Sequence, residues 1–137
     1  MNIHSIAAHL NELADNTSTG MVFDCQPISG EVDVLQITIQ GREELPVFLS
    51  VSDDQVICIT YLWGEQEIIK EKRVAMLEAM LEMSIPMPLS AFSKIGDKYA
   101  IFGALSINSS FADIEHELAV LSNNALEVID DMSEFLI

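Results

Sequence analysis

The order of helix-like and strand-like segments limits what this chain can fold into more than any other feature of its sequence. Apolar residues recur every three or four positions over residues 3–14, which predicts an amphipathic first helix. Strand-like segments follow, then a second helix at residues 65–83, two more strands and a last helix after Ser110. This order (helix, three-stranded antiparallel segment, helix, two strands, helix) predicts an α+β fold.

The first strand block contains four runs with strand character, at residues 21–28, 32–39, 45–51 and 56–63. Alternation within the second run gives it one strongly apolar face. Turn-forming residues 52–55 join the last two runs as a hairpin. The first run has the weakest pattern, so we expect three regular strands, with residues 21–28 as an edge or irregular strand.

Proline and capping residues set the ends of the later helices. Pro86 and Pro88 prevent the second helix from continuing. Ser110, with Asp113 three residues later, resembles a capping box that opens the last helix.

The two later strands are expected at residues 87–92 and 98–106, on either side of a turn at residues 96–97. No repeat, linker or low-complexity stretch interrupts the 137 residues. We therefore expect a single α+β domain spanning residues 1–137.

The chain is strongly acidic, with 22 Asp and Glu residues, 6 Lys and Arg residues and a formal net charge of −16. Such a surface repels phosphates, which argues against binding to nucleic acid and against direct binding to an anionic membrane. Two explanations remain for the charge. It keeps an apolar-rich protein soluble, or it steers a basic partner towards it.

The first residues lack the basic start and apolar stretch of a signal peptide, so a cytoplasmic location is expected. Cys25 and Cys58 both lie in apolar strand-like runs. In a chain without an export signal we expect them to be buried thiols, and a disulfide or a redox role is the alternative.

Residues arranged for catalysis or metal binding are missing from the sequence. There is no glycine-rich phosphate loop and no nucleophile-elbow serine. His4 and His9 are five residues apart, which places them on different faces of a helix, and His116 is expected to be solvated. We therefore expect no enzyme activity, no catalytic residues, no metal and no cofactor.

Methionine is the feature that suggests binding. Met76, Met80 and Met83 recur at four and three residues on the second predicted helix, and flexible methionine side chains adapt to varied apolar partners. The same helix carries more apolar residues than one face can bury, which favours contact with another chain, most simply a second copy. The alternative is that the stripe is ordinary core. The hypothetical protein-binding residues are Ile69, Met76, Leu77, Met80, Leu81 and Met83.

Several segments resemble the bacterial YjfI family, a domain of unknown function. They are Arg-Glu-Glu-Leu-Pro-Val-Phe-Leu-Ser-Val at residues 42–51, the run at 57–63, Ile-Pro-Met-Pro-Leu-Ser-Ala-Phe at 85–92, the run at 99–106 and Asn-Asn-Ala at 123–125. The likeness extends over nearly the whole chain. It carries no catalytic residues, because none is established in that family.

The resemblance implies an association with a phage-shock-protein-A-like coiled-coil protein, and so with an envelope-stress system. The element order also resembles type III secretion chaperones and YbjN-like regulators, which are small, acidic and usually dimeric. That second likeness is one of topology and is an analogy for function.

Two functions fit these observations. The first is a non-enzymatic, homodimeric adaptor or chaperone-like protein that holds another protein on its second helix and on the exposed face or edge of its sheet. Its negative field would favour partners with basic flanks. The alternative is a regulatory protein that senses a small molecule in an apolar pocket between helices and sheet.

Overall fold

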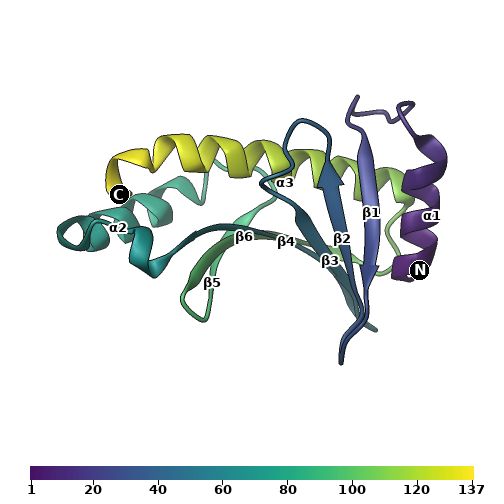
Figure 1. Cartoon of the computed structure of the whole chain (residues 1–137), viewed down its shortest axis with the longest axis horizontal. Coiled ribbons are helices and arrows are strands. Elements are labelled where there is room, and N and C mark those ends of the chain that lie inside the picture. Colours follow the sequence, from purple (N-terminus) through teal and green to yellow (C-terminus); the bar gives the residue numbers. More distant parts are fainter.

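The computed structural model describes residues 1–137 as one six-stranded antiparallel sheet with helices on one face (Figure 1). The sheet order is β1-β2-β3-β4-β6-β5. The strands are β1 (Phe23–Ile28), β2 (Val34–Ile39), β3 (Val47–Val51), β4 (Gln55–Gly64), β5 (Ala91–Ile95) and β6 (Lys98–Ser106), and the helices are α1 (Ile3–Leu13), α2 (Arg73–Met83) and α3 (Phe111–Asp131). The predicted α+β fold is confirmed.

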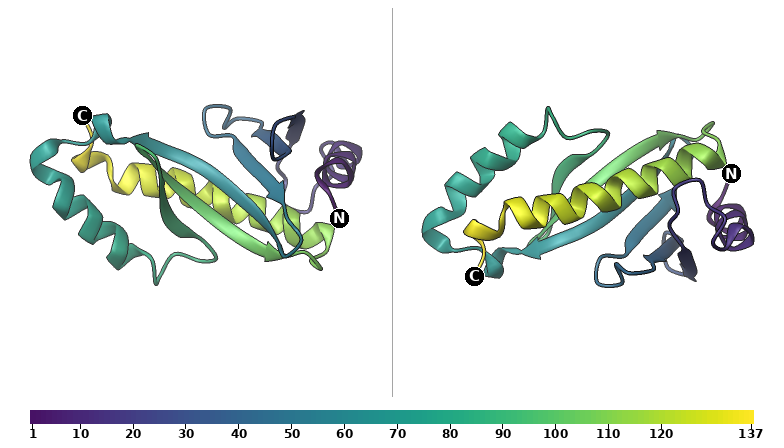
Figure 2. Two further views of the ribbon diagram at one scale, coloured as in Figure 1. Left: turned by 90° about the horizontal axis from the view of Figure 1, so that it is seen from below. Right: turned by 90° about the horizontal axis from the view of Figure 1, so that it is seen from above.

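The core lies between the inner face of the sheet and the helices α1 and α3. Alternation on β2 buries Leu35, Ile37 and Ile39, while the residues between them stay half-exposed. From α3, apolar residues three and four apart point at the sheet: Ile114, Leu118, Leu121, Ala125 and Val128. α3 runs along the length of the sheet (Figure 2), so one helix joins the two ends of the molecule.

The first strand block has four strands, where three regular strands were predicted. β1 pairs antiparallel with β2 along its whole length, from Phe23 opposite Ile39 to Ile28 opposite Val34. It is an edge strand, as the sequence allowed, and Pro27 is tolerated there because an edge strand can lack one N–H. Its pattern is weak because only Phe23 is fully buried.

The second helix is shorter than predicted. Only residues Arg73–Met83 are α-helical, and two 3₁₀ turns at Glu65–Glu67 and Lys70–Lys72 precede them. Between these turns the backbone pairs with the C-terminal segment: the Ile69 N–H donates to the Phe135 carbonyl at 2.8 Å, and the Ile137 N–H donates to the Glu67 carbonyl at 2.8 Å. A helix through these residues would lose those bonds, so tertiary pairing overrides local helix propensity.

The fifth strand begins four residues later than predicted, at Ala91 rather than at residue 87. Pro86, Pro88 and the positive φ of 60° at Leu89 hold the preceding residues in a loop. The β5–β6 turn at Gly96 and the capping box of α3 are confirmed: the Asp113 N–H donates to Ser110 Oγ at 3.1 Å, and the Ser110 N–H donates to the Asp113 carboxylate at 3.0 Å. No helix is both long and apolar enough to cross a membrane.

Two acids of α3 face inward and differ in their partners. Glu115 accepts hydrogen bonds from His9 at 3.1 Å and from Ser18, which ties α3 to α1. Burial raises the pKa of Glu115, but these hydrogen bonds outweigh it and hold the pKa below its usual range. Glu117 lies over β6, and its Oε1 has no hydrogen-bond partner although the residue is buried. Burial raises the pKa of Glu117 to about 7.

Gly103 makes room for the Glu117 carboxyl group. A Cβ atom at this position of β6 would overlap with Glu117 Oε1. The sheet therefore has room for the buried Glu117 carboxyl group only because the residue beneath it, Gly103, has no side chain.

We predict that Glu117→Gln stabilises the protein at alkaline pH. The native state keeps a proton on Glu117 up to about pH 7, whereas the unfolded chain loses it near the ordinary value of 4.5, so the native state binds more protons and its stability falls as pH rises through this window. The variant should be more stable by about 1–2 kcal/mol near pH 8 and little changed near pH 5.

Urea unfolding at the two pH values measures this difference. Glu127→Gln, at an exposed glutamate of the same helix, is the matched control and should show no such pH dependence. Equal effects of the two substitutions would contradict a buried, protonated Glu117.

Candidate functional site

Helix α2 lies beyond the edge strand β5, not over the strands, and both views in Figure 2 show it standing apart. Met76 and Met80 anchor it, with 0% and 5% of their surface exposed. Two hollows result, one on each side of the helix. We call them the methionine pocket and the α2–β5 groove.

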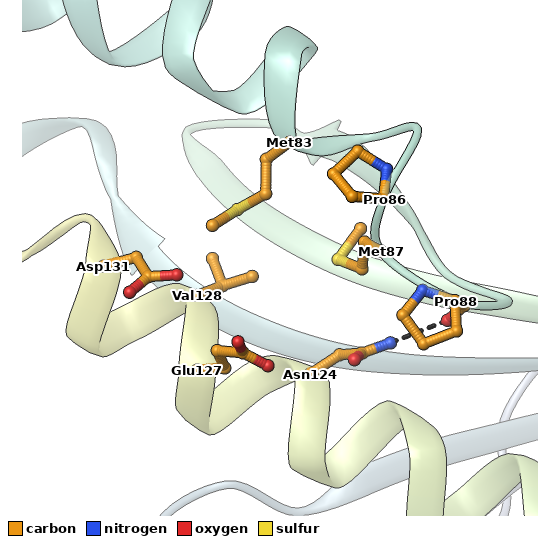
Figure 3. Close-up of a pocket in the computed structure, with 8 residues that line it drawn as sticks. All are labelled: Met83, Pro86, Met87, Pro88, Asn124, Glu127, Val128 and Asp131. Atoms are coloured by element: carbon orange, nitrogen blue, oxygen red, sulfur yellow. Dashed lines mark hydrogen bonds between the residues drawn. The ribbon is translucent and has the colours of Figure 1, made fainter.

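The methionine pocket lies between the end of α2, the loop that follows it and α3 (Figure 3). Its volume is about 210 Å³ and its lining residues are Met83, Pro86, Met87, Pro88, Asn124, Glu127, Val128 and Asp131. Met83, Met87 and Val128 give it an apolar floor. Glu127 and Asp131, one helical turn apart, give it an acidic rim.

Asn124 holds the loop that forms this pocket. Its side-chain amide donates to the Pro88 carbonyl at 2.8 Å and to Ser90 Oγ at 2.9 Å, and the residue is 5% exposed (Figure 3 shows the first bond). At the two preceding residues of α3, Arg42 Nη1 donates to Ser122 Oγ and to Asn123 Oδ1. The Asn-Asn pair thus fastens two loops of the sheet to α3, which is a structural role.

The α2–β5 groove is larger, at about 530 Å³. Its lining residues are Arg73, Leu77, Met80, Leu81 and Ser84 from α2 and its end, and Ala91, Phe92, Ser93, Lys94 and Tyr99 from the β5–β6 hairpin. Leu81 is 74% exposed and Phe92 is half-buried, so apolar surface faces the opening. This is the largest apolar surface beside α2.

Positive charge borders the α2–β5 groove. Arg73 Nε donates to Glu65 at 2.8 Å, and the Tyr99 hydroxyl donates to the same carboxylate at 3.1 Å. Partial burial raises the pKa of Glu65, but the bonds from Arg73 and Tyr99 outweigh it and leave the pKa lowered. Lys94 Nζ lies 5.8 Å from the centre of the Tyr99 ring, and no carboxylate is within 4 Å of it.

The sequence groups Lys70, Lys72 and Arg73 on the second predicted helix, where pairing with acids across an interface is expected, but only the fold brings Lys94 to the same groove as Arg73. Five of the six Lys and Arg residues fall between residues 70 and 98: Lys70, Lys72, Arg73, Lys94 and Lys98. A partner with basic flanks, as expected from the net charge, suits the acidic rim of the methionine pocket. It does not suit the α2–β5 groove, where Arg73 is paired with Glu65 and the unpaired Lys94 favours an acidic group.

The predicted binding residues divide among four environments. Met76 is core, and Met80 is buried at the floor of the groove. Leu77 and Leu81 line the groove, and Met83 lines the methionine pocket. Ile69 is half-buried ahead of α2, in the segment that pairs with the C-terminus. Their role in binding stays a prediction.

The groove residues from the hairpin were missed, because Phe92, Lys94 and Tyr99 belong to another element and only the fold brings them to α2. The one available signal was the gathering of cations between residues 70 and 98 in an acidic chain.

The thiols and histidines lie apart. Cys25 and Cys58 are both free, Cys58 is buried and Cys25 is half-buried. Burial and the neighbouring Asp24 raise the pKa of Cys25 to about 11, and burial followed by Glu117 raises the pKa of Cys58 further, so both are protonated at neutral pH. The His9 ring stacks on Phe111 at 4.4 Å, and His116 is exposed. No group of three His, Cys, Asp or Glu residues could hold a metal ion.

An antiparallel sheet with helices packed on one face defines an α+β protein, and comparisons with known proteins agree with this fold. The chain belongs to the DUF2170 family, described as uncharacterized proteins conserved in bacteria, whose model matches residues 2–136. The crystal structure of YbjN from E. coli, proposed to be a transcription regulator, is similar to this chain with a TM-score of 0.69 and 10% identity. The match covers 100% of this chain and 96% of YbjN.

The YbjN-like topology expected from the sequence is therefore confirmed. At this identity the likeness shows the fold alone. No curated protein matches the chain in sequence. The resemblance to the YjfI family by name stays an expectation.

We predict that Asn124→Ala lowers the free energy of unfolding by about 1–3 kcal/mol, because it removes both hydrogen bonds that the nearly buried amide donates, to the Pro88 carbonyl and to Ser90 Oγ. Urea unfolding measures the loss. Asn123→Ala, at the exposed neighbour that only accepts from Arg42, is the control and should cost less than half as much. Equal losses would show that Asn124 does not hold the loop.

Proposed function

We propose that this protein is a non-enzymatic adaptor or chaperone-like protein that holds another protein in the α2–β5 groove. The observation that carries this proposal is the groove itself: about 530 Å³ beside a helix whose outer leucine is 74% exposed. Exposed apolar surface rimmed by polar groups is typical of protein-interaction sites.

The packing of α2 supports this proposal. Met76 and Met80 bury one side of the helix, so Leu77 and Leu81 can contact a partner without loss of the protein's own core. Arg73 and Lys94 at the border supply the polar rim. Affinity would come from the leucines and Phe92, and orientation from the cations.

A homodimer is part of the proposal, through the outer face of the sheet. Phe48, Ile59 and Phe102 lie side by side there on β3, β4 and β6, and Phe48 meets Tyr61 at 5.8 Å. The outward residues of β3 and β4 carry no charge, so two acidic chains can meet there without opposing carboxylates.

We predict that the Ile59→Glu variant sediments as a monomer and the parent chain as a dimer, because the new charge would be buried between the two sheets. Analytical ultracentrifugation is the measurement. A dimer in both proteins would contradict dimerisation through this face.

The partner class implied by the sequence resemblance is a phage-shock-protein-A-like coiled-coil protein. An envelope-stress role is proposed on that ground, with a segment of this partner outside its coiled coil held in the groove. Contact with a membrane would then be indirect, through the partner, because the acidic surface is repelled by anionic lipid.

The second candidate function is a small-molecule-sensing regulator. The groove volume falls in the range of ligand pockets, and Arg73, Lys94 and the Tyr99 hydroxyl could anchor an acidic ligand. The description of YbjN as a proposed transcription regulator is compatible with this role. A thermal-shift screen of metabolites and lipids without any stabilising compound would count against it.

We predict that Leu81→Glu abolishes recovery of the partner when the tagged protein is purified from its native cell after mild crosslinking. A charge placed against the partner's apolar surface should weaken binding about tenfold or more while leaving the fold intact, because Leu81 is exposed. Mass spectrometry of the recovered proteins is the measurement.

Ala75→Glu is the matched control, since Ala75 is exposed about a third of a turn away from Leu81 on the same helix and does not line the groove. The control should recover the partner at the parent level. If Leu81→Glu also recovers it, the groove is not the binding site and the adaptor proposal fails.

A further inference from the structure

The two edge strands of the sheet differ in how well they are protected against pairing with another strand. β1 carries Pro27 and Asp24, features that hinder the pairing of another strand. β5, at the other edge, has the sequence Ala-Phe-Ser-Lys-Ile, with no proline and no bulge. Lys94 is its one residue of a kind that hinders pairing with another strand.

The outer edge of β5 is free. β5 pairs only with β6, and no backbone hydrogen bond outside that hairpin involves its residues. In an antiparallel strand, every second residue points its N–H and C=O groups to the unpaired side. β5 therefore offers a row of backbone donors and acceptors to another extended chain.

Helix α2 is positioned so that it would cover a strand added beside β5, and this chain has no strand there. On β5, Phe92 and Lys94 pair with Ile101 and Tyr99, which are buried on the inner face, so both side chains belong to that face and both line the groove. The opposite wall of the groove is α2, beyond the edge (Figure 2). A strand added to β5 would project its inner side chains towards Leu77 and Leu81.

The charges of the groove select the added strand. Lys94 has no carboxylate within 4 Å, whereas Arg73, at the same border, is already paired with Glu65 at 2.8 Å. A second copy of β5 would bring another Lys94 to this edge, so like charges oppose self-pairing. An incoming strand with an acidic residue on its inner face would complement Lys94.

We propose that the partner binds as an extended segment that pairs with the outer edge of β5 as a seventh strand. Its inner face carries apolar residues that fill the groove under Leu77 and Leu81, and an acidic residue that meets Lys94. The inference rests on the proposed adaptor function and specifies how the partner is held. This is strand addition, in which backbone pairing gives affinity and alternate side chains give specificity.

The test uses the full chain and a synthetic peptide, acetyl-Glu-Thr-Val-Thr-Val-Thr-Glu-amide. Its glutamates and valines share one face, and its near-symmetry supplies an acid in either strand direction. Isothermal titration measures binding, and hydrogen–deuterium exchange measures protection of the β5 amides. The control peptide replaces both glutamates with lysine.

The acidic peptide is expected to bind and to slow exchange at β5, and the lysine peptide to bind about tenfold more weakly or not at all. Lys94→Glu should reverse this preference. Lys98→Glu, the same charge change on the neighbouring strand at a residue that does not line the groove, should preserve it. Two N-methylated versions of the acidic peptide are compared, one methylated at the three threonines and one at the two valines. Only one of the two should lose binding, because alternate amides face β5.

Two results would overturn strand addition: no saturable binding of the acidic peptide, or binding that leaves exchange at β5 unchanged. Neither result touches the adaptor proposal, which depends on recovery of the native partner and on its loss in Leu81→Glu. If that partner is recovered without protection of β5, the groove holds it in another form and only the strand-addition proposal fails.

Discussion

The packing of α3 along the inner face of the sheet is the interaction on which the rest of the structure depends. Its apolar stripe, from Ile114 to Val128, is almost fully buried, and burial of such side chains stabilises a fold by about 1.5–3 kcal/mol each. The same helix fastens α1 through Glu115 and the loop after α2 through Asn124. One helix therefore positions both the N-terminal helix and the walls of the methionine pocket.

The groove is a consequence of how the chain reaches α2. Backbone hydrogen bonds that join Ile69 and Glu67 to the C-terminal segment delay the start of the helix and hold that start at the far end of the sheet. α2 then runs beyond β5, with methionines on its inner side and leucines towards the groove. A small protein that leaves an apolar groove open beside an unpaired edge strand has a binding surface at a cost in its own stability.

The sequence predicted the elements whose patterns are local. The first helix, the capping box at Ser110 and the hairpin turn at residues 52–55 were confirmed, because periodicity and turn chemistry determine them. The predictions for the length of α2 and for the start of β5 were wrong. Pairing with the C-terminal segment determines where α2 begins, and the positive φ of Leu89 delays β5. Only one side of the groove could be predicted from the sequence. Leu77 and Leu81 on α2 were identified, whereas Phe92 and Lys94 on β5 come close to α2 only in the folded chain.

Photo-crosslinking in the native cell tests the central claim, that the α2–β5 groove holds a partner protein, most directly. A photoreactive amino acid at position 81, on the groove, is compared with one at position 75, which is exposed on another face of the same helix. The account predicts one dominant crosslinked protein from position 81 and none from position 75. Equal crosslinking from both positions, or none from position 81, would contradict it.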